Sequence, residues 1–148
     1  MTEWEEYLGV PGATEQQIQA LEARIGRPLP SDFREALRSH QGQSPKSFSL
    51  VLPSGRQPAF GCLFHCDPNS DEYDAYDIGG RMSILEEEHG LHQLVPFAHS
   101  GNAVFCIDYS QEDQPIVFVN LDLTREDPGS RVRVASSFAE FCGMTMRG

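Results

Sequence analysis

The chain has 148 residues, 39% of them hydrophobic and 22% charged, a composition typical of one globular domain. Its net charge of -11 disfavours binding to nucleic acid, which depends on Lys and Arg, and to anionic membranes. No apolar run approaches the roughly 20 residues that span a bilayer, and residues 1–6 are acidic where a secretory signal is basic and then apolar. We therefore expect residues 1–148 to form a single cytoplasmic domain.

Two helices are predicted in the first third of the chain. Thr14 and Gln17 fit a capping box, and apolar residues at helical spacing follow as far as Gly26. After a proline turn, Ser31 is expected to cap a second helix, which Gly42 ends. Because neither helix can bury its apolar face alone, both must pack on another element.

Short segments rich in aromatic and β-branched residues predict strands at 48–52, 59–64, 103–109 and 115–121. The polar segment 110–114, which separates the last two, has the length of a hairpin loop. Capping boxes at 83–86 and 137–140 predict a short helix ending at Gly90 and a closing helix. Helices, an antiparallel meander and a closing helix define an α+β fold.

Residues 94–110 hold the residue types of a nucleophilic enzyme, with His99, Cys106 and Asp108 close together. In a strand, however, Cys106 shares its face with Val104, whereas a reactive thiol needs an exposed, electropositive setting. The pattern favours a core strand after a Gly-Asn turn, so we expect no catalytic residues and no enzyme. A thiol enzyme that uses Cys106 with His99 is the alternative.

Cys62 and Cys66, with His65 between them, suggest a zinc site. Structural zinc takes four ligands, usually from two clusters, and the second cluster is missing from this sequence. We expect no metal and no cofactor, and we interpret all four cysteines as reduced thiols. The glycines at 79–80 lack the phosphate-loop pattern and are expected to form a turn.

Acidic residues are concentrated between Asp67 and Glu88, where eight of them face only Arg81. Such a segment would suit a basic partner and would speed the encounter with it, although acids also simply keep a protein soluble. Tyrosines between the acids favour a protein interface. The candidate partner-binding residues are Asp71, Glu72, Tyr73, Asp74, Tyr76, Asp77, Glu86 and Glu87.

The order of several short motifs resembles the SUKH superfamily. At the front, residues 18–42 contain a helix ending in Gly26, a Leu-Pro turn and a helix ending in Gly42. The rear motifs are Pro-Phe-Ala at 96–98, Gly-Asn at 101–102, Ile-Asp-Tyr at 107–109 and Ser-Ser-Phe-Ala-Glu-Phe at 136–141. Segment 48–90 contributes little, and the His40-Gln41 that precedes Gly42 departs from the family's usual Asn-Gly or Gly-Gly.

This resemblance implies an α+β fold in which N-terminal helices and a C-terminal helix pack on a twisted antiparallel β-sheet. It implies a framework role for Asp108 and no catalytic constellation. The superfamily includes bacterial immunity proteins that neutralise a cognate toxin, often a nuclease, and a yeast regulator of cell-wall assembly. The resemblance therefore implies an immunity protein that binds a basic toxin domain, or alternatively a regulatory adaptor that binds a host protein.

Overall fold

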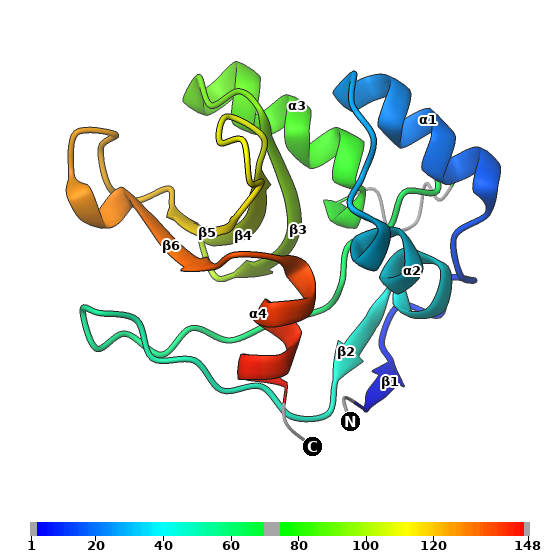
Figure 1. The fold of residues 1–148 in the computed structure, drawn as a ribbon, viewed down its shortest axis with the longest axis horizontal. Helices are drawn as coiled ribbons and strands as arrows, with labels where there is room; N and C mark the ends of the chain where they lie inside the picture. The colour runs from blue at the N-terminus through cyan, green and yellow to red at the C-terminus, as the bar shows by residue number, and fades with distance from the viewer. Residues whose placement is uncertain (1–2, 70–74, 147–148) are drawn as a thin grey trace.

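The computed structural model describes residues 3–69 and 75–146, which form an antiparallel sheet surrounded by helices (Figure 1). The sheet contains β3 (Leu94–Ser100), β4 (Ala103–Asp108), β5 (Ile116–Asn120) and β6 (Arg131–Ala135), in that spatial order. Each strand pairs with the next along the chain, so the sheet is a meander. The helices α1 (Glu15–Ile25), α2 (Ser31–His40), α3 (Ile78–His89) and α4 (Phe138–Thr145) complete the α+β fold that was predicted.

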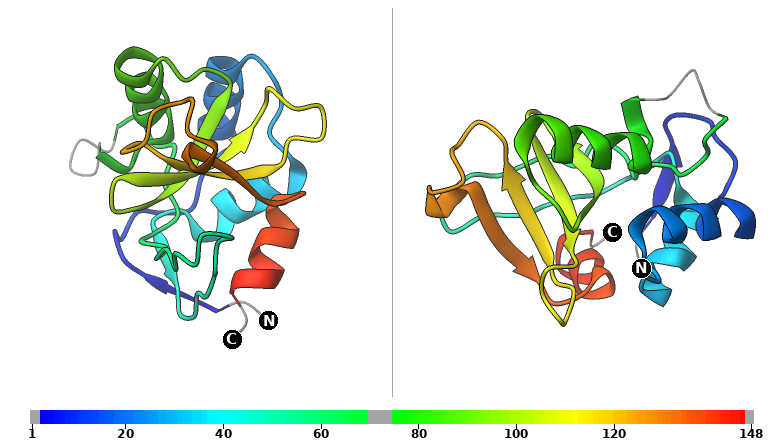
Figure 2. Two further views of the ribbon diagram at one scale, coloured as in Figure 1. Left: turned by 90° about the vertical axis from the view of Figure 1, so that its left-hand side faces the viewer. Right: turned by 90° about the horizontal axis from the view of Figure 1, so that it is seen from above.

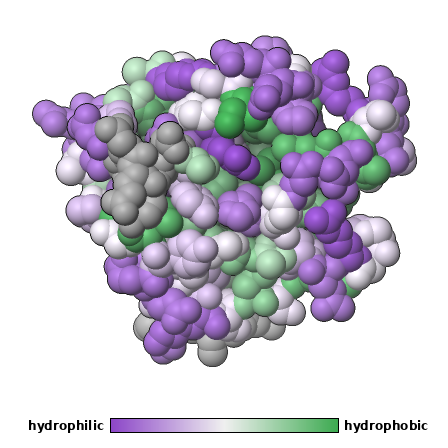
Figure 3. Space-filling view, turned by 180° about the vertical axis from the view of Figure 1, so that it is seen from behind, coloured by the Kyte–Doolittle hydropathy of each residue, from purple (hydrophilic) through white to green (hydrophobic). Residues whose placement is uncertain are grey.

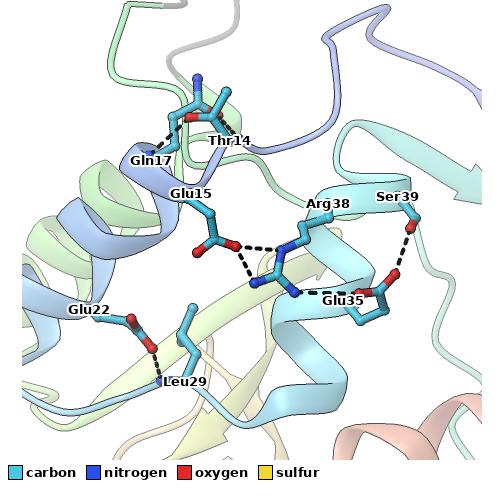
Figure 4. A network of polar contacts seen from close by, with 8 residues as sticks. All are labelled: Thr14, Glu15, Gln17, Glu22, Leu29, Glu35, Arg38 and Ser39. Atoms are coloured by element: carbon cyan, nitrogen blue, oxygen red, sulfur yellow. Dashed lines mark hydrogen bonds and ion pairs between the residues drawn. The ribbon is translucent and has the colours of Figure 1, made fainter.

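The two N-terminal helices begin and end close to their predicted positions. Thr14 forms the predicted capping box, because its hydroxyl accepts from the Gln17 amide at 3.2 Å and its own amide donates to the Gln17 side chain at 3.1 Å. Ser31 does not cap α2, since the cap residue is Pro30 and Ser31 is the first helical residue. The helices are joined by Arg38, whose Nε donates to Glu15 at 2.8 Å (Figure 4).

Asp32, and not Ser31, accepts hydrogen bonds at the start of α2, and it also contacts the start of α4. Asp32 accepts a hydrogen bond from the Phe33 amide at 2.8 Å and a second from the Ala139 amide, also at 2.8 Å. Ser137 caps the same end of α4, accepting from the Glu140 amide at 3.1 Å, as predicted. One carboxylate therefore ties the start of α2 to the start of α4 across 107 residues of chain.

Helix α3 begins before the predicted capping box at 83–86, which was the wrong start. Its N-cap is Asp77, whose carboxylate accepts from the Gly80 amide at 2.9 Å. Gly79 and Gly80 form the first helical turn, not the separate glycine turn that was predicted. Ser83 lies inside the helix, and its hydroxyl donates to the Gly79 carbonyl at 3.3 Å. Asp77 satisfies a free amide at the helix end and so supports a first turn that contains two glycines.

The strands predicted at 48–52 and 59–64 are not formed. Their backbone amides donate to scattered partners, such as Ser49 to Thr145 and Phe64 to Phe97, and not to one neighbouring strand. The apolar pattern was nevertheless a correct indication of burial, because Leu52, Phe60 and Phe64 all lie in the main core. A segment interrupted by prolines can fill a core without forming a continuous ladder.

Several strands were not predicted. They are β3, β6 and a separate pair formed by β1 (Trp4–Glu6) and β2 (Gln43–Pro45). Gly42, expected only to end α2, also lets the chain turn into β2, with a φ of 77°. A Cβ atom there would lie 2.4 Å from Val10, so the position requires glycine for both reasons.

The sheet is buried on both faces. The larger core lies on the face that carries Phe105, Ile107 and Phe118, where it packs against α1, α2 and α4. On the other face, Val104 and Cys106 pack with Leu85, at the end of α3, and with Leu94. Side chains alternate between these faces along β4, as period two requires. Consequently every residue of β4 is buried.

Candidate functional site

Cys106 and Asp108, which the sequence offers as a catalytic pair, are structural in this fold. Cys106 is fully buried, and burial raises the pKa of its thiol well above the ordinary value. Asp108 is 2% exposed and accepts hydrogen bonds from the Ser110 amide at 2.9 Å and the Ser110 hydroxyl at 2.5 Å. Arg131 lies 3.4 Å from the same carboxylate. Asp108 therefore holds the turn after β4 and joins it to β6.

His99 lies among aromatic rings. Its imidazole stacks on Phe64 with centroids 5.8 Å apart and lies 5.7 Å from Tyr76. Burial, and secondarily the charge of Arg81, lowers the pKa of His99, which favours the neutral ring. The geometry therefore provides no arrangement in which His99 activates Cys106.

The cysteines of the suggested zinc site lie in different cores. Cys62 packs with Leu8 and Val10, whereas Cys66 belongs to the main core. Burial raises the pKa of both thiols to about 12. Within the described residues, no group of three or more His, Cys, Asp or Glu side chains is placed to hold a metal ion.

The acidic candidates that the structure describes are divided between the two ends of α3. Asp71, Glu72, Tyr73 and Asp74 lie outside the described residues. Tyr76 and Asp77 immediately precede the helix, and Glu86 and Glu87 lie near its C-terminal end, about 14 Å away along its axis. The described candidates therefore form two groups and not one patch.

Two of these candidates have partners inside the protein. Asp77 caps α3, and Glu86 forms an ion pair with Arg24 at 2.5 Å and lies 3.8 Å from His92. Glu87 is exposed, whereas Tyr76 is half-buried. Replacing Asp77 or Glu86 would therefore change the fold's own contacts as well as any interface.

The structure brings a third acidic segment to the start of α3, and sequence reasoning missed it. Tyr7 is 60% exposed, and its ring meets that of Tyr76 edge-on with centroids 6.5 Å apart. Glu5 and Glu6, which precede Tyr7, are also exposed. Two glutamates flanked by Trp4 and Tyr7 were a usable signal for this segment. We call Glu5, Glu6, Tyr7, Tyr76 and Asp77 the acidic–aromatic surface.

The back of the molecule, the side on which α3 lies, is mainly hydrophilic (Figures 2 and 3). Its hydrophobic areas are small and separated by polar residues (Figure 3). Contacts made on this side would therefore depend chiefly on polar and charged groups, with single aromatic rings as apolar anchors.

The architecture, helices packed on an antiparallel meander, defines the class of protein as α+β. A family model described as the SMI1 / KNR4 family (SUKH-1) matches residues 12–143, and the chain belongs to this family. The family is generally non-catalytic, and membership indicates protein partners in general. No curated protein matches the chain. Among the described residues, no helix is long and apolar enough to cross a membrane.

Proposed function

We propose that this protein is a cytoplasmic immunity protein that binds and neutralises a cognate bacterial toxin domain without catalysing a reaction. The proposal also treats residues 1–148 as a single SUKH domain. The observation that carries it is membership of the SUKH-1 family, together with an exposed surface of carboxylates and tyrosines. The resemblance drawn from the sequence motifs supports it, because bacterial SUKH proteins often neutralise toxins.

Electrostatics supports a basic toxin as the partner. A nuclease needs a positive surface to bind phosphate, and a chain with a net charge of -11 competes for that surface. Acids that are not used internally also accelerate association with a positive partner. Tyr7 supplies a largely exposed ring that can enter a pocket of the partner, which is a common role of tyrosine at interfaces.

The first test is a capture experiment with the full chain. The toxin domains of the same genome are expressed in catalytically inactive form, and the protein is used to capture them. Recovery of one basic domain, in a complex that weakens as salt rises, is the expected result. Recovery of an ordinary cellular protein and no toxin would instead favour a regulatory adaptor.

The second test locates the interface. Glu5→Lys and Glu6→Lys, with Tyr7→Ala, change exposed residues and leave the Asp77 cap in place. The only described contact they remove besides the Tyr7–Tyr76 ring contact is the hydrogen bond from Gln43 to Glu6. We expect slower association with the captured toxin and a smaller dependence on salt. The matched control is Glu112→Lys with Glu126→Lys, which reverses two exposed acids in loops of the sheet half. If both variants had equal effects, binding would depend on the net charge of the protein and not on the acidic–aromatic surface.

A further inference from the structure

A groove of about 520 Å³ lies beside β6, one of the two edge strands of the sheet. One wall is β6 itself, and the other is the loop at 52–56, which runs below the strand in Figure 1 and in the left view of Figure 2. The half-buried Val132 contributes apolar surface to it, and the buried Phe118 lies at its base. This volume is in the range of known ligand sites, about 300–1,000 Å³.

The outer edge of β6 is unpaired. The strand pairs with β5 on one side, and no strand in the described part of the chain pairs with it on the other. In an antiparallel strand, alternate residues direct both their N–H and C=O groups away from the existing neighbour. Such an edge is a template for an added strand.

The charge of this groove is opposite to that of the protein. Its lining residues include Arg56, Arg131 and Arg133 and no carboxylate, in a chain with twice as many acids as bases. Arg56 is exposed, and its guanidinium lies over the Phe118 ring at 5.1 Å with no described ion-pair partner. Arg131 and Arg133 have carboxylate neighbours, yet their side chains remain 37% and 51% exposed.

We propose that β6 binds an extended acidic segment of a partner protein, which adds to the sheet as a further antiparallel strand. The sequence of β6 specifies the pattern of that segment. Val132 and Val134 pack on the main core, so Arg131 and Arg133 face the opposite side of the sheet. The partner strand therefore carries acidic side chains on the arginine side and apolar ones on the valine side.

A second copy of the chain fits this edge poorly. In an antiparallel pairing of two β6 strands, side chains on the same face meet, so arginines would lie opposite arginines. Like charges directly opposite each other destabilise a strand pair. The edge thus disfavours self-association and selects an acidic partner, independently of the toxin-binding surface proposed above.

The probe is a fluorescein-labelled, acetylated peptide, Gly-Glu-Val-Glu-Val-Glu-Gly amide, titrated to about 1 mM against the full chain. At about 0.15 M salt the Debye length is about 8 Å, so the protein's distant acids are largely screened. We expect saturable binding, and slower hydrogen exchange at the amides of residues 131–135. A peptide with Lys in place of Glu is expected not to bind.

Backbone pairing is tested by N-methylation. One peptide isomer is methylated at the Glu nitrogens and the other at the Val nitrogens. Since only alternate amides face β6, one isomer should lose binding and the other should keep it. Equal behaviour of the two isomers, or no binding by the unmodified peptide, would overturn the proposal.

The role of charge is tested with Arg131→Gln and Arg133→Gln, because these two arginines lie on the side where the partner strand carries its acids. Each should weaken binding about two- to fivefold, as expected for an exposed ion pair. Lys46→Gln is the matched control, because it removes one exposed charge at β2's end of the molecule. An equal loss in that control would overturn the assignment, as would concentration-dependent dimerisation that protects the same amides without peptide.

Discussion

Strands β4 and β6 belong to the same sheet, yet their residues have very different chemical availability. β4 is central, all its residues are buried, and its thiol and carboxylate are enclosed by apolar or structural contacts. β6 is an edge strand whose arginines are exposed. The comparison shows that position in a sheet, and not the residue types alone, decides whether polar groups can meet a partner.

The largest expected effect is on β4. Phe105→Ala removes a fully buried ring that contacts Phe60, Phe97, Phe118 and Phe141. We expect a loss of about 3–5 kcal/mol in the free energy of unfolding, measured by urea titration. On β6, Val132→Ala should cost about 1 kcal/mol or less, because Val132 is a smaller side chain and is only half-buried. Similar losses of stability in the two variants would contradict the view that β4 is buried and β6 is exposed.

Asp108 and Arg131 connect the two strands. Replacing Asp108 should lower the free energy of unfolding more than replacing Arg131. Asp108→Ala removes the acceptor of two hydrogen bonds, from the Ser110 amide and the Ser110 hydroxyl, each worth about 1 kcal/mol, so it should cost about 2 kcal/mol. Arg131→Gln removes a partly exposed side chain 3.4 Å from the carboxylate and should cost about 1 kcal/mol. Chemical denaturation of each variant measures the difference. Arg131→Gln as the more damaging change would show that Asp108 depends on charge pairing.

The dependence of stability on pH tests whether the cysteines are buried. Burial raises the thiol pKa of Cys62 and Cys66 from 9.0 to about 12. The folded state keeps these thiols neutral. Their contribution to the free energy of unfolding is therefore fully present below pH 9 and is lost as pH rises from 9 towards 12. Each thiol should then lower the free energy of unfolding by about 1.4 kcal/mol per pH unit above 9.

Urea titrations between pH 7 and 10.5 measure this loss of stability. In parallel samples at pH 8, iodoacetamide should label the buried Cys62, Cys66 and Cys106 only after urea is added. Rapid labelling of Cys106 in the folded protein would show that β4 opens to solvent and would remove the basis of the comparison.

The smallest effect is expected at the surface pair Arg24–Glu86. Their side chains are 39% and 28% exposed, so a double-mutant cycle with Arg24→Ala and Glu86→Ala should give a coupling of about 0.5 kcal/mol. A coupling above about 2 kcal/mol would mean that Glu86 is mainly structural, which would argue against its role as a partner-binding residue.

Local patterns predicted the elements that depend on local contacts. The Thr14 and Ser137 caps, the hairpin between β4 and β5 and the apolar faces of α1 and α2 all follow from residues a few positions apart. The start of α3 and the strand β3 were missed although their partners are close in sequence. The strands predicted at 48–52 and 59–64 failed because strand pairing depends on partners far apart in sequence. Residues 59–64 have the composition of a strand, but only the folded chain decides whether a neighbouring strand is available.

The sequence predicted which residue types make up the candidate surface, but not which residues belong to it. The sequence located an acidic, tyrosine-containing segment before α3, but it could not show that Tyr7 meets Tyr76, that Asp77 caps a helix, or that Glu86 pairs with Arg24. Charge is a property of the residue, whereas its availability depends on what else the fold brings within reach.

The sequence by itself determined the α+β class, the family motifs, the acidic character and the burial of the apolar segments, because these depend on composition and short-range periodicity. Only the tertiary structure decided which side chains enclose Cys106, that Tyr7 meets Tyr76 beside the start of α3, and that the outer edge of β6 is open. These features are set by contacts between residues that are distant in the chain, and no local pattern encodes them.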